Sequence, residues 1–160
     1  MFLLPWLESE AKSPFPLPRW QGKFVLKHGR PFTPRPLPKG IKPSELHLCF
    51  ENNQMALPGS DLVYCEGYAL QKGLTRPTHH AWLSTRDGFV VDRTWTAKRL
   101  NLKKAAIPLG VEYFGVPFNM IFVLHHSFHV GSYCSLLDAT DEWSLWKTKP
   151  PAKKFLERIG

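Results

Sequence analysis

Cysteine is scarce in this sequence: there are three among 160 residues, and an odd number cannot all pair within one chain. A secretory signal is not recognisable, because the apolar stretch at residues 1–7 is short and lacks a basic start. We therefore expect reduced thiols and a cytoplasmic protein.

Long apolar runs are missing too, since none approaches the ~20 residues of a membrane-spanning helix, and we expect no membrane partner. The sequence has no glycine-rich phosphate loop, dinucleotide fingerprint or paired Cys-x-x-Cys motif. His125, His126 and His129 have no carboxylate or cysteine at a zinc-finger spacing. On a strand, His79 should face away from His80. We therefore expect no metal and no cofactor.

Acidic residues are outnumbered by basic ones, 13 against 21, which gives a formal net charge of +8. A hydrophobic content of 43% is enough for the core of one domain. Many of the basic residues fall in two groups, which are Lys98, Arg99, Lys103 and Lys104, and Lys147, Lys149, Lys153, Lys154 and Arg158. Because no stacking aromatic residues accompany them, we expect only weak, salt-sensitive and sequence-independent nucleic-acid binding.

Proline is concentrated near the amino terminus, where residues 1–42 hold eight of the 15 prolines. Proline fixes φ and removes a backbone donor, which disfavours long helices and central strands. We predict that residues 1–42 form a proline-rich arm wrapping the domain, with a short strand at residues 21–26. A ligand for a proline-binding partner is the alternative. Residues 43–148 then form the core domain and residues 149–160 a basic tail.

The stretch from Cys49 to Trp95 has the residue types of cysteine catalysis on recognisable elements. Pro43 and Ser44 indicate a helix start, which places Cys49 in the first two turns of a helix that ends near residue 58. Residues 61–70, 78–85 and 89–95 are typical of strands, with a hairpin turn at residues 87–88. Further on, residues 111–116 and 119–124 favour strands on either side of Pro117, and residues 132–148 favour a helix.

A thiol nucleophile needs a base to take its proton and a third group to orient that base. Cys49, His80 and Asp92 have the types and order for these three roles. Cys65 is the weaker candidate nucleophile, because a strand offers no helix N-terminus to favour its thiolate. Glu66, on the opposite strand face, either orients a site residue or stays solvated at a rim. A hydrolase without a thiol, built on Glu66 and His80, is a further alternative.

Four motifs follow one another here: Cys49-Phe50-Glu51-Asn52, Tyr64-Cys65-Glu66-Gly67-Tyr68, His80-Ala81-Trp82 and Asp92-Arg93-Thr94-Trp95. Their order resembles the transglutaminase-like branch of the papain-like cysteine hydrolases. It is also similar to uncharacterised phage and bacterial proteins with Cys-Phe-x-Asn, Glu-Gly-Tyr, His-Ala-Trp and Asp-x-Thr-Trp. We expect Glu66, Asn52, Trp82 and Trp95 to support the triad. Arg93 departs from the family's proline, and Cys49 lies about a turn deeper in its expected helix than an ideal nucleophile.

We therefore predict an α+β domain in which an amino-terminal, cysteine-bearing helix packs on an antiparallel sheet of about four to six strands. The resemblance implies a transglutaminase-like or papain-like fold and an enzyme of acyl groups. Its reaction would be peptide or isopeptide hydrolysis, deamidation or acyl transfer on a protein or peptide. The alternative is a non-catalytic binding or inhibitory protein that keeps the fold. If phage-encoded, it would act in the host cytoplasm on a host protein or nucleic acid.

Overall fold

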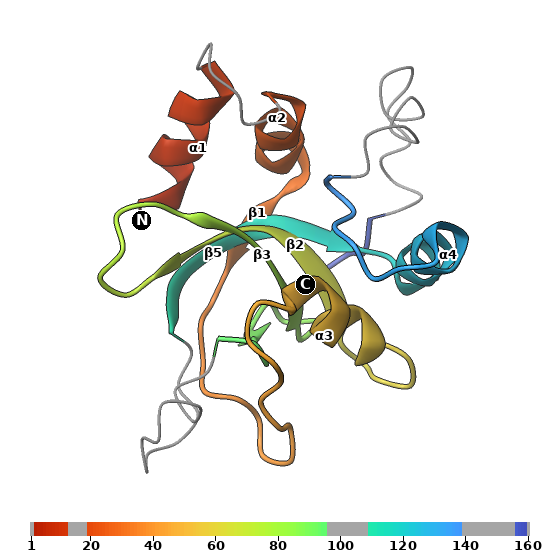
Figure 1. Ribbon diagram of the computed structural model, residues 1–160. Coiled ribbons are helices and arrows are strands. Elements are labelled where there is room, and N and C mark those ends of the chain that lie inside the picture. The colour runs from red at the N-terminus through yellow and green to blue at the C-terminus, as the bar shows by residue number, and fades with distance from the viewer. Residues whose placement is uncertain (1, 13–18, 96–108, 139–155, 160) are drawn as a thin grey trace.

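The computed structural model describes residues 2–12, 19–95, 109–138 and 156–159, which form a mixed α/β domain (Figure 1). Five strands build one curled antiparallel sheet in the order β1-β5-β2-β3-β4. The strands are β1 (Arg30–Phe32), β2 (Val63–Gln71), β3 (Thr78–Ser84), β4 (Val90–Val91) and β5 (Gly110–Phe118). The antiparallel α+β class and the expected number of strands are confirmed.

Four helices are described, which are α1 (Leu3–Lys12), α2 (Arg19–His28), α3 (Cys49–Met55) and α4 (Met120–Val130). Each contributes apolar side chains to a cluster on one sheet face, where Tyr64, Tyr68 and Val116 alternate inward. A second cluster around Trp82 and Tyr113 lies on the opposite face. Full burial of each such side chain stabilises the fold by about 1.5–3 kcal/mol.

The amino-terminal segment is helical, so the expectation of an arm without long helices, with a strand at residues 21–26, is wrong. Pro5 lies in the first turn of α1, where helical N–H groups have no carbonyl partner within the helix. No proline occurs within Arg19–His28. Leu3, Leu7 and Val25 are fully buried in the main cluster, so both helices belong to the core.

The expected strands at residues 61–70 and 78–85 are confirmed to within two residues, and the turn at residues 87–88 is present. The third expected strand shrinks to Val90–Val91. The reason is local: the Asp92 carboxylate accepts hydrogen bonds from the backbone N–H groups of Thr94 and Trp95, both at 2.9 Å. Such a side-chain contact curls the backbone into a turn and ends the strand.

In the carboxyl-terminal half, β5 runs through Pro117, so the expected break there is wrong. The Pro117 carbonyl accepts from Glu157 N at 3.1 Å. N–H and C=O groups of one strand residue point to the same side, so the missing donor faces away from β2. Because the pairing of β1 ends at Gly115, no ladder bond is lost.

The expected strand at residues 119–124 is instead the start of α4. The Asn119 side chain caps the helix by accepting from Ile121 N at 2.9 Å, and Gly131 ends it with a φ of 71°. An apolar run over residues 120–124 concealed these two helix signals. Residues 132–138 are not helical, although Leu136 and Leu137 are buried, and residues 139–148 lie outside the described chain.

None of the four helices in the described ranges is long and apolar enough to cross a membrane.

Gly67 and Gly115 face each other across β2 and β5, and both positions exclude a side chain. A Cβ on Gly67 would lie 2.4 Å from Gly115 Cα. A Cβ on Gly115 would lie 2.5 Å from Cη2 of Trp82 and 2.7 Å from the Glu66 carbonyl oxygen. The two strands therefore approach closely here, and the missing side chain of Gly115 leaves room for Trp82.

We expect Gly115→Ala to lower the free energy of unfolding by about 1–3 kcal/mol, because the new methyl group overpacks Trp82 and the backbone. The control is Gly22→Ala within α2, where a Cβ meets Ala11 at an ordinary 4.0 Å. This change should stabilise the helix by up to about 1 kcal/mol. Urea unfolding measures both, and a Gly115→Ala protein as stable as the wild type would contradict the packing described.

Candidate active site

Cys49 is the first residue of α3, so the expected helix start near residues 43–45 is wrong. The Ser44 N–H donates to the Arg93 carbonyl at 2.8 Å, which keeps this segment extended against the chain after β4. His47 has a positive φ of 65°, a conformation uncommon outside glycine. The nucleophile candidate thus stands at the helix start and not a turn deeper.

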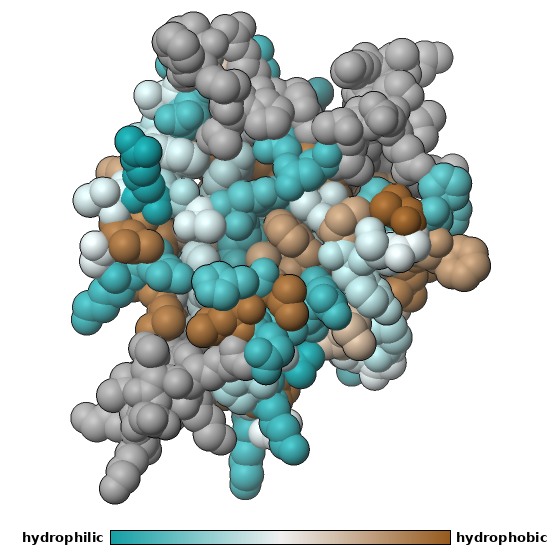
Figure 2. All heavy atoms as spheres, in the orientation of Figure 1, coloured by the Kyte–Doolittle hydropathy of each residue, from teal (hydrophilic) through white to brown (hydrophobic). Residues whose placement is uncertain are grey.

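The segment that leads into α3 presents apolar side chains to solvent. Leu46 is 41% exposed and Leu48 44% exposed, and brown apolar atoms lie over this part of the molecule among teal ones (Figure 2). Cys49 itself keeps 8% of its surface exposed. The residues just before Cys49 therefore present apolar side chains to solvent.

A side chain of α3 fastens this helix to the free edge of β3. The Asn53 amide donates to the Cys49 carbonyl at 2.7 Å and to the Ala81 carbonyl at 2.9 Å. β4 pairs only with Leu83 and Ser84, so the edge at Ala81 is open to the helix. This contact places Cys49 beside the residue that precedes Ala81, His80.

His80 joins the other two predicted triad residues. Its Nε2 lies 2.9 Å from Asp92 Oδ2, and Cys49 lies close enough to raise the pKa of the ring. Since Nε2 faces the carboxylate, Nδ1 is the nitrogen left for the thiol. The Trp95 ring stacks on the imidazole with centroids 3.8 Å apart, and Trp82 follows at 6.3 Å. Trp95 therefore packs directly on the His80 ring, and Trp82 lies farther from it.

Asp92 is buried and fully hydrogen-bonded. Besides His80 and the two backbone N–H groups, its Oδ2 accepts from the Tyr113 hydroxyl at 2.8 Å. Burial alone would raise the Asp92 pKa, but His80 and these donors outweigh it and hold the pKa below its usual value. Sequence reasoning missed Tyr113. The alternation of a strand indicates which sheet face a side chain occupies, but not which residue it contacts there.

Burial lowers the His80 pKa, but the charge of Asp92 and the hydrogen bonds to Asp92 and Cys49 outweigh that effect and raise it to about 9. The ring is therefore protonated at neutral pH. A protonated imidazole beside Asp92 can donate a proton during a reaction at this site.

Two side chains tie the loop before Cys49 to the chain after Asp92. The Asn52 amide donates to the Glu45 carbonyl at 2.6 Å and to Thr94 Oγ1 at 3.1 Å. Arg93 donates from Nε to the Lys42 carbonyl at 3.1 Å and from Nη1 to the Asn52 carbonyl at 3.4 Å. Asn52 and Arg93 therefore supply two links between these segments.

Glu66 is fully buried, so the expectation of a solvated rim is wrong. It accepts from His79 Nε2 at 2.9 Å and from the Tyr64 hydroxyl at 3.0 Å. The Ser135 hydroxyl and the backbone N–H groups of Leu136 and Leu137 complete its contacts. The carboxylate near His80 is Asp92, so the pair Glu66–His80 has no support. His79 faces away from His80, as predicted.

Cys65 lies within the sheet and is fully buried. Its sulfur is 3.6 Å from Ser84 Oγ and 3.7 Å from the Val63 carbonyl, and burial raises its pKa strongly. It therefore has the environment of a core residue.

The sequence did not indicate a second thiol–imidazole contact, between Cys134 Sγ and His126 Nε2 at 3.5 Å.

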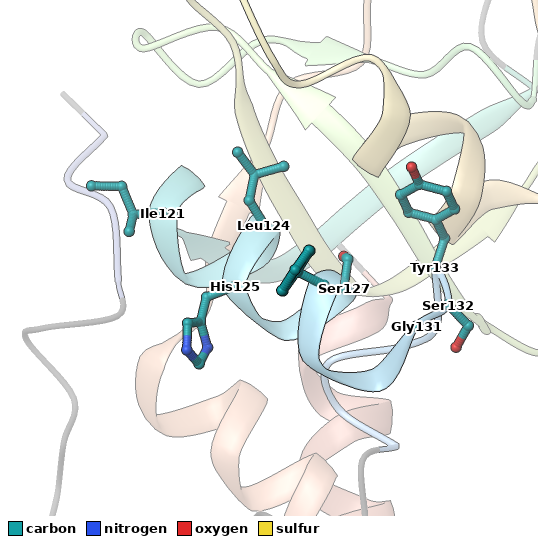
Figure 3. Close-up of a pocket in the computed structure, with 8 residues that line it drawn as sticks. Ile121, Leu124, His125, Ser127, Gly131, Ser132 and Tyr133 are labelled. Carbon is teal, nitrogen blue, oxygen red and sulfur yellow. The ribbon is translucent and has the colours of Figure 1, made fainter.

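A cavity of about 890 Å³ runs along α4 and the following turn, and includes no triad residue (Figure 3). Its walls include Ile121, Leu124, Phe128 and Tyr133. Within the ranges that the structure describes, no group of three or more His, Cys, Asp or Glu could hold a metal ion.

Comparison of the chain with protein families, curated proteins and solved structures finds no match. The roles of the triad residues thus rest on their contacts. Of the two basic groups, only Arg158 lies among the described residues, so weak nucleic-acid binding stays a prediction.

We expect the free energy of unfolding to fall as pH rises from about 6.5 to about 9. The folded pKa of His80 is raised from 6.5 to about 9, so its stabilising effect is complete below the unfolded value and lost through this window. His80→Gln should flatten the profile there. His125→Gln, an exposed change on α4, should keep it, and urea unfolding at three pH values measures all three proteins. A wild-type profile as flat as that of His80→Gln would contradict the raised pKa.

Proposed function

We propose that this protein is a cysteine-dependent enzyme of acyl groups with a transglutaminase-like or papain-like fold. The carrying observation is that His80 pairs with Asp92 beside Cys49, at the edge where α3 meets β3. A helix-borne thiol beside a histidine and an aspartate from the following strand region supports the family resemblance. A protein or peptide amide is the proposed substrate.

In the proposed reaction, the Cys49 thiolate attacks the carbonyl carbon of the amide and forms a tetrahedral intermediate. The His80 imidazolium donates its proton to the leaving nitrogen as the C–N bond breaks, which leaves a thioester and releases an amine. Water or a second amine then attacks the thioester while His80 takes its proton. The Cys49 thiolate leaves with a carboxylic acid or a new amide as product, and Asp92 orients the ring throughout.

The developing oxyanion needs donors. The Cys49 N–H opens α3, and the first N–H groups of a helix have no carbonyl partner within it. This group is the first proposed donor. The Asn52 amide is engaged with Glu45 and Thr94, so it serves the loop and not the oxyanion.

The segment from Leu46 to Leu48 is the proposed contact surface for the substrate chain beside the sulfur. Two exposed leucines there offer apolar contact. The positive φ of His47 is a local strain of the kind that clusters at functional sites.

We expect Cys49 to react with iodoacetamide at pH 7 faster than Cys65 and Cys134, because the proposed catalytic base, His80, lies beside it. Mass spectrometry of the digested protein gives the rate at each cysteine. His80→Ala should slow the reaction at Cys49 by at least about tenfold, within the usual worth of a catalytic base. His126→Ala removes the imidazole beside Cys134 and should leave the Cys49 rate unchanged.

A Cys49 that reacts no faster in the folded protein than in the urea-unfolded chain would remove the basis for the enzyme. The non-catalytic binding or inhibitory protein with the same fold would then be the better proposal.

A further inference from the structure

A cavity of about 590 Å³ lies between α1 and the hairpin that joins β2 to β3. Its lining includes Trp6 and Glu10 from α1, Tyr68 from β2, Arg76 from the hairpin and His79 from β3. None of these residues has a part in the proposed chemistry at Cys49.

Tyr68 supplies the observation that points to a ligand. The residue is only 2% exposed, and its hydroxyl is buried without a hydrogen-bond partner among the described residues. A buried hydroxyl left unpaired is costly, and a ligand atom in the cavity could restore the missing bond. Trp6 contacts the same ring, with centroids 5.4 Å apart and planes at 60°, so the two aromatic rings form a corner of the cavity.

The charges around this corner favour a cation. Burial raises the Tyr68 pKa to about 12, with further contributions from the nearby carboxylates of Asp138, Glu66 and Glu10. Glu66 is paired with His79, and Asp138 lies 3.7 Å from His79 Nδ1. Glu10 lines the cavity itself. A carboxylate, a hydroxyl acceptor and aromatic rings together bind an ammonium or guanidinium group on an aliphatic stem.

The cavity is also connected to the proposed nucleophile. Phe50 follows Cys49, and its ring contacts His79 with centroids 5.3 Å apart. His79 in turn lines the cavity. A substrate chain that crosses Phe50 would therefore run from the sulfur to the Tyr68 corner.

We propose that this cavity is a specificity subsite for a basic side chain of the peptide substrate, with Glu10, Trp6 and Tyr68 as its recognition groups. The subsite rests on the proposed function, since it selects substrates for Cys49. The bound cation is not the reacting group, because Phe50 and His79 lie between the subsite and the sulfur. Arg76 at the wall opposes a cation and limits the affinity.

Binding is measured by calorimetry on full-length Cys49→Ser protein. This variant lacks the proposed nucleophile, so the peptide analogue binds without being consumed. Nα-acetyl-lysine amide should bind about tenfold more tightly than Nα-acetyl-norleucine amide, which lacks the charge. Glu10→Gln should weaken lysine binding about two- to fivefold, and Arg76→Gln should strengthen it by a similar factor. Glu8→Gln, an exposed change on the same helix, should leave it unchanged.

The connection between the subsite and the sulfur is tested by the rate at which chloroacetyl peptides label Cys49 in the wild-type protein. A lysine-bearing reagent should label Cys49 several-fold faster than its norleucine analogue, and Glu10→Gln should remove the difference. If lysine analogues bind Cys49→Ser protein while wild-type Cys49 is no more reactive than in the unfolded chain, the enzyme proposal fails and the cation site remains, although not as a subsite.

Three results would overturn the inference. The first is equal binding of the lysine and norleucine amides. The second is tighter binding of Nα-acetyl-glutamate amide that is lost in Arg76→Gln, which would make the cavity a carboxylate site. The third is lysine binding without faster labelling of a reactive Cys49.

Discussion

The buried contact between Asp92 and His80 is the interaction on which the rest of the site depends. Asp92 accepts four hydrogen bonds, so a charge in the protein interior is compensated from two backbone N–H groups, Tyr113 and His80. The same bonds end β4 and fix the His80 ring beside Cys49. Removing one partner of such a pair leaves the other charge buried without compensation, which typically lowers the free energy of unfolding by several kcal/mol. The Asp92 carboxylate therefore determines both where β4 ends and how the His80 ring is placed for the proposed reaction.

Two neighbouring histidines of β3 have different surroundings on the two faces of the sheet. His79 and His80 point to opposite faces of β3, and each meets a buried carboxylate. Glu66 pairs with His79 and also accepts from the Ser135 hydroxyl and the N–H groups of Leu136 and Leu137, which ties the chain after α4 to the sheet. Asp92 occupies one nitrogen of His80 and leaves the other free to face Cys49. Only the second pair therefore lies beside the proposed nucleophile.

The order of Cys49, His80 and Asp92 was sufficient to predict their meeting, because hairpin strands must lie side by side and the helix must cover them. The start of α3 was not predictable, since Ser44 bonds to the distant Arg93 and does not cap a helix. Tyr113 and the enclosure of Glu66 depend on strand neighbours far apart in sequence. The amino-terminal helices were missed because proline was counted without regard to its position in the first turn, and α4 because its apolar run outweighed its caps.

The central claim is that His80 holds a proton between Asp92 and the Cys49 sulfur. Nitrogen-15 NMR of the His80 ring, titrated from pH 5 to pH 10, tests it most directly, with Cys49→Ser as the companion protein. We predict a midpoint near 9 in the wild type and a lower one in Cys49→Ser, because Cys49 contributes to the raised pKa. Equal midpoints near the ordinary value of 6.5 in both proteins would contradict the account.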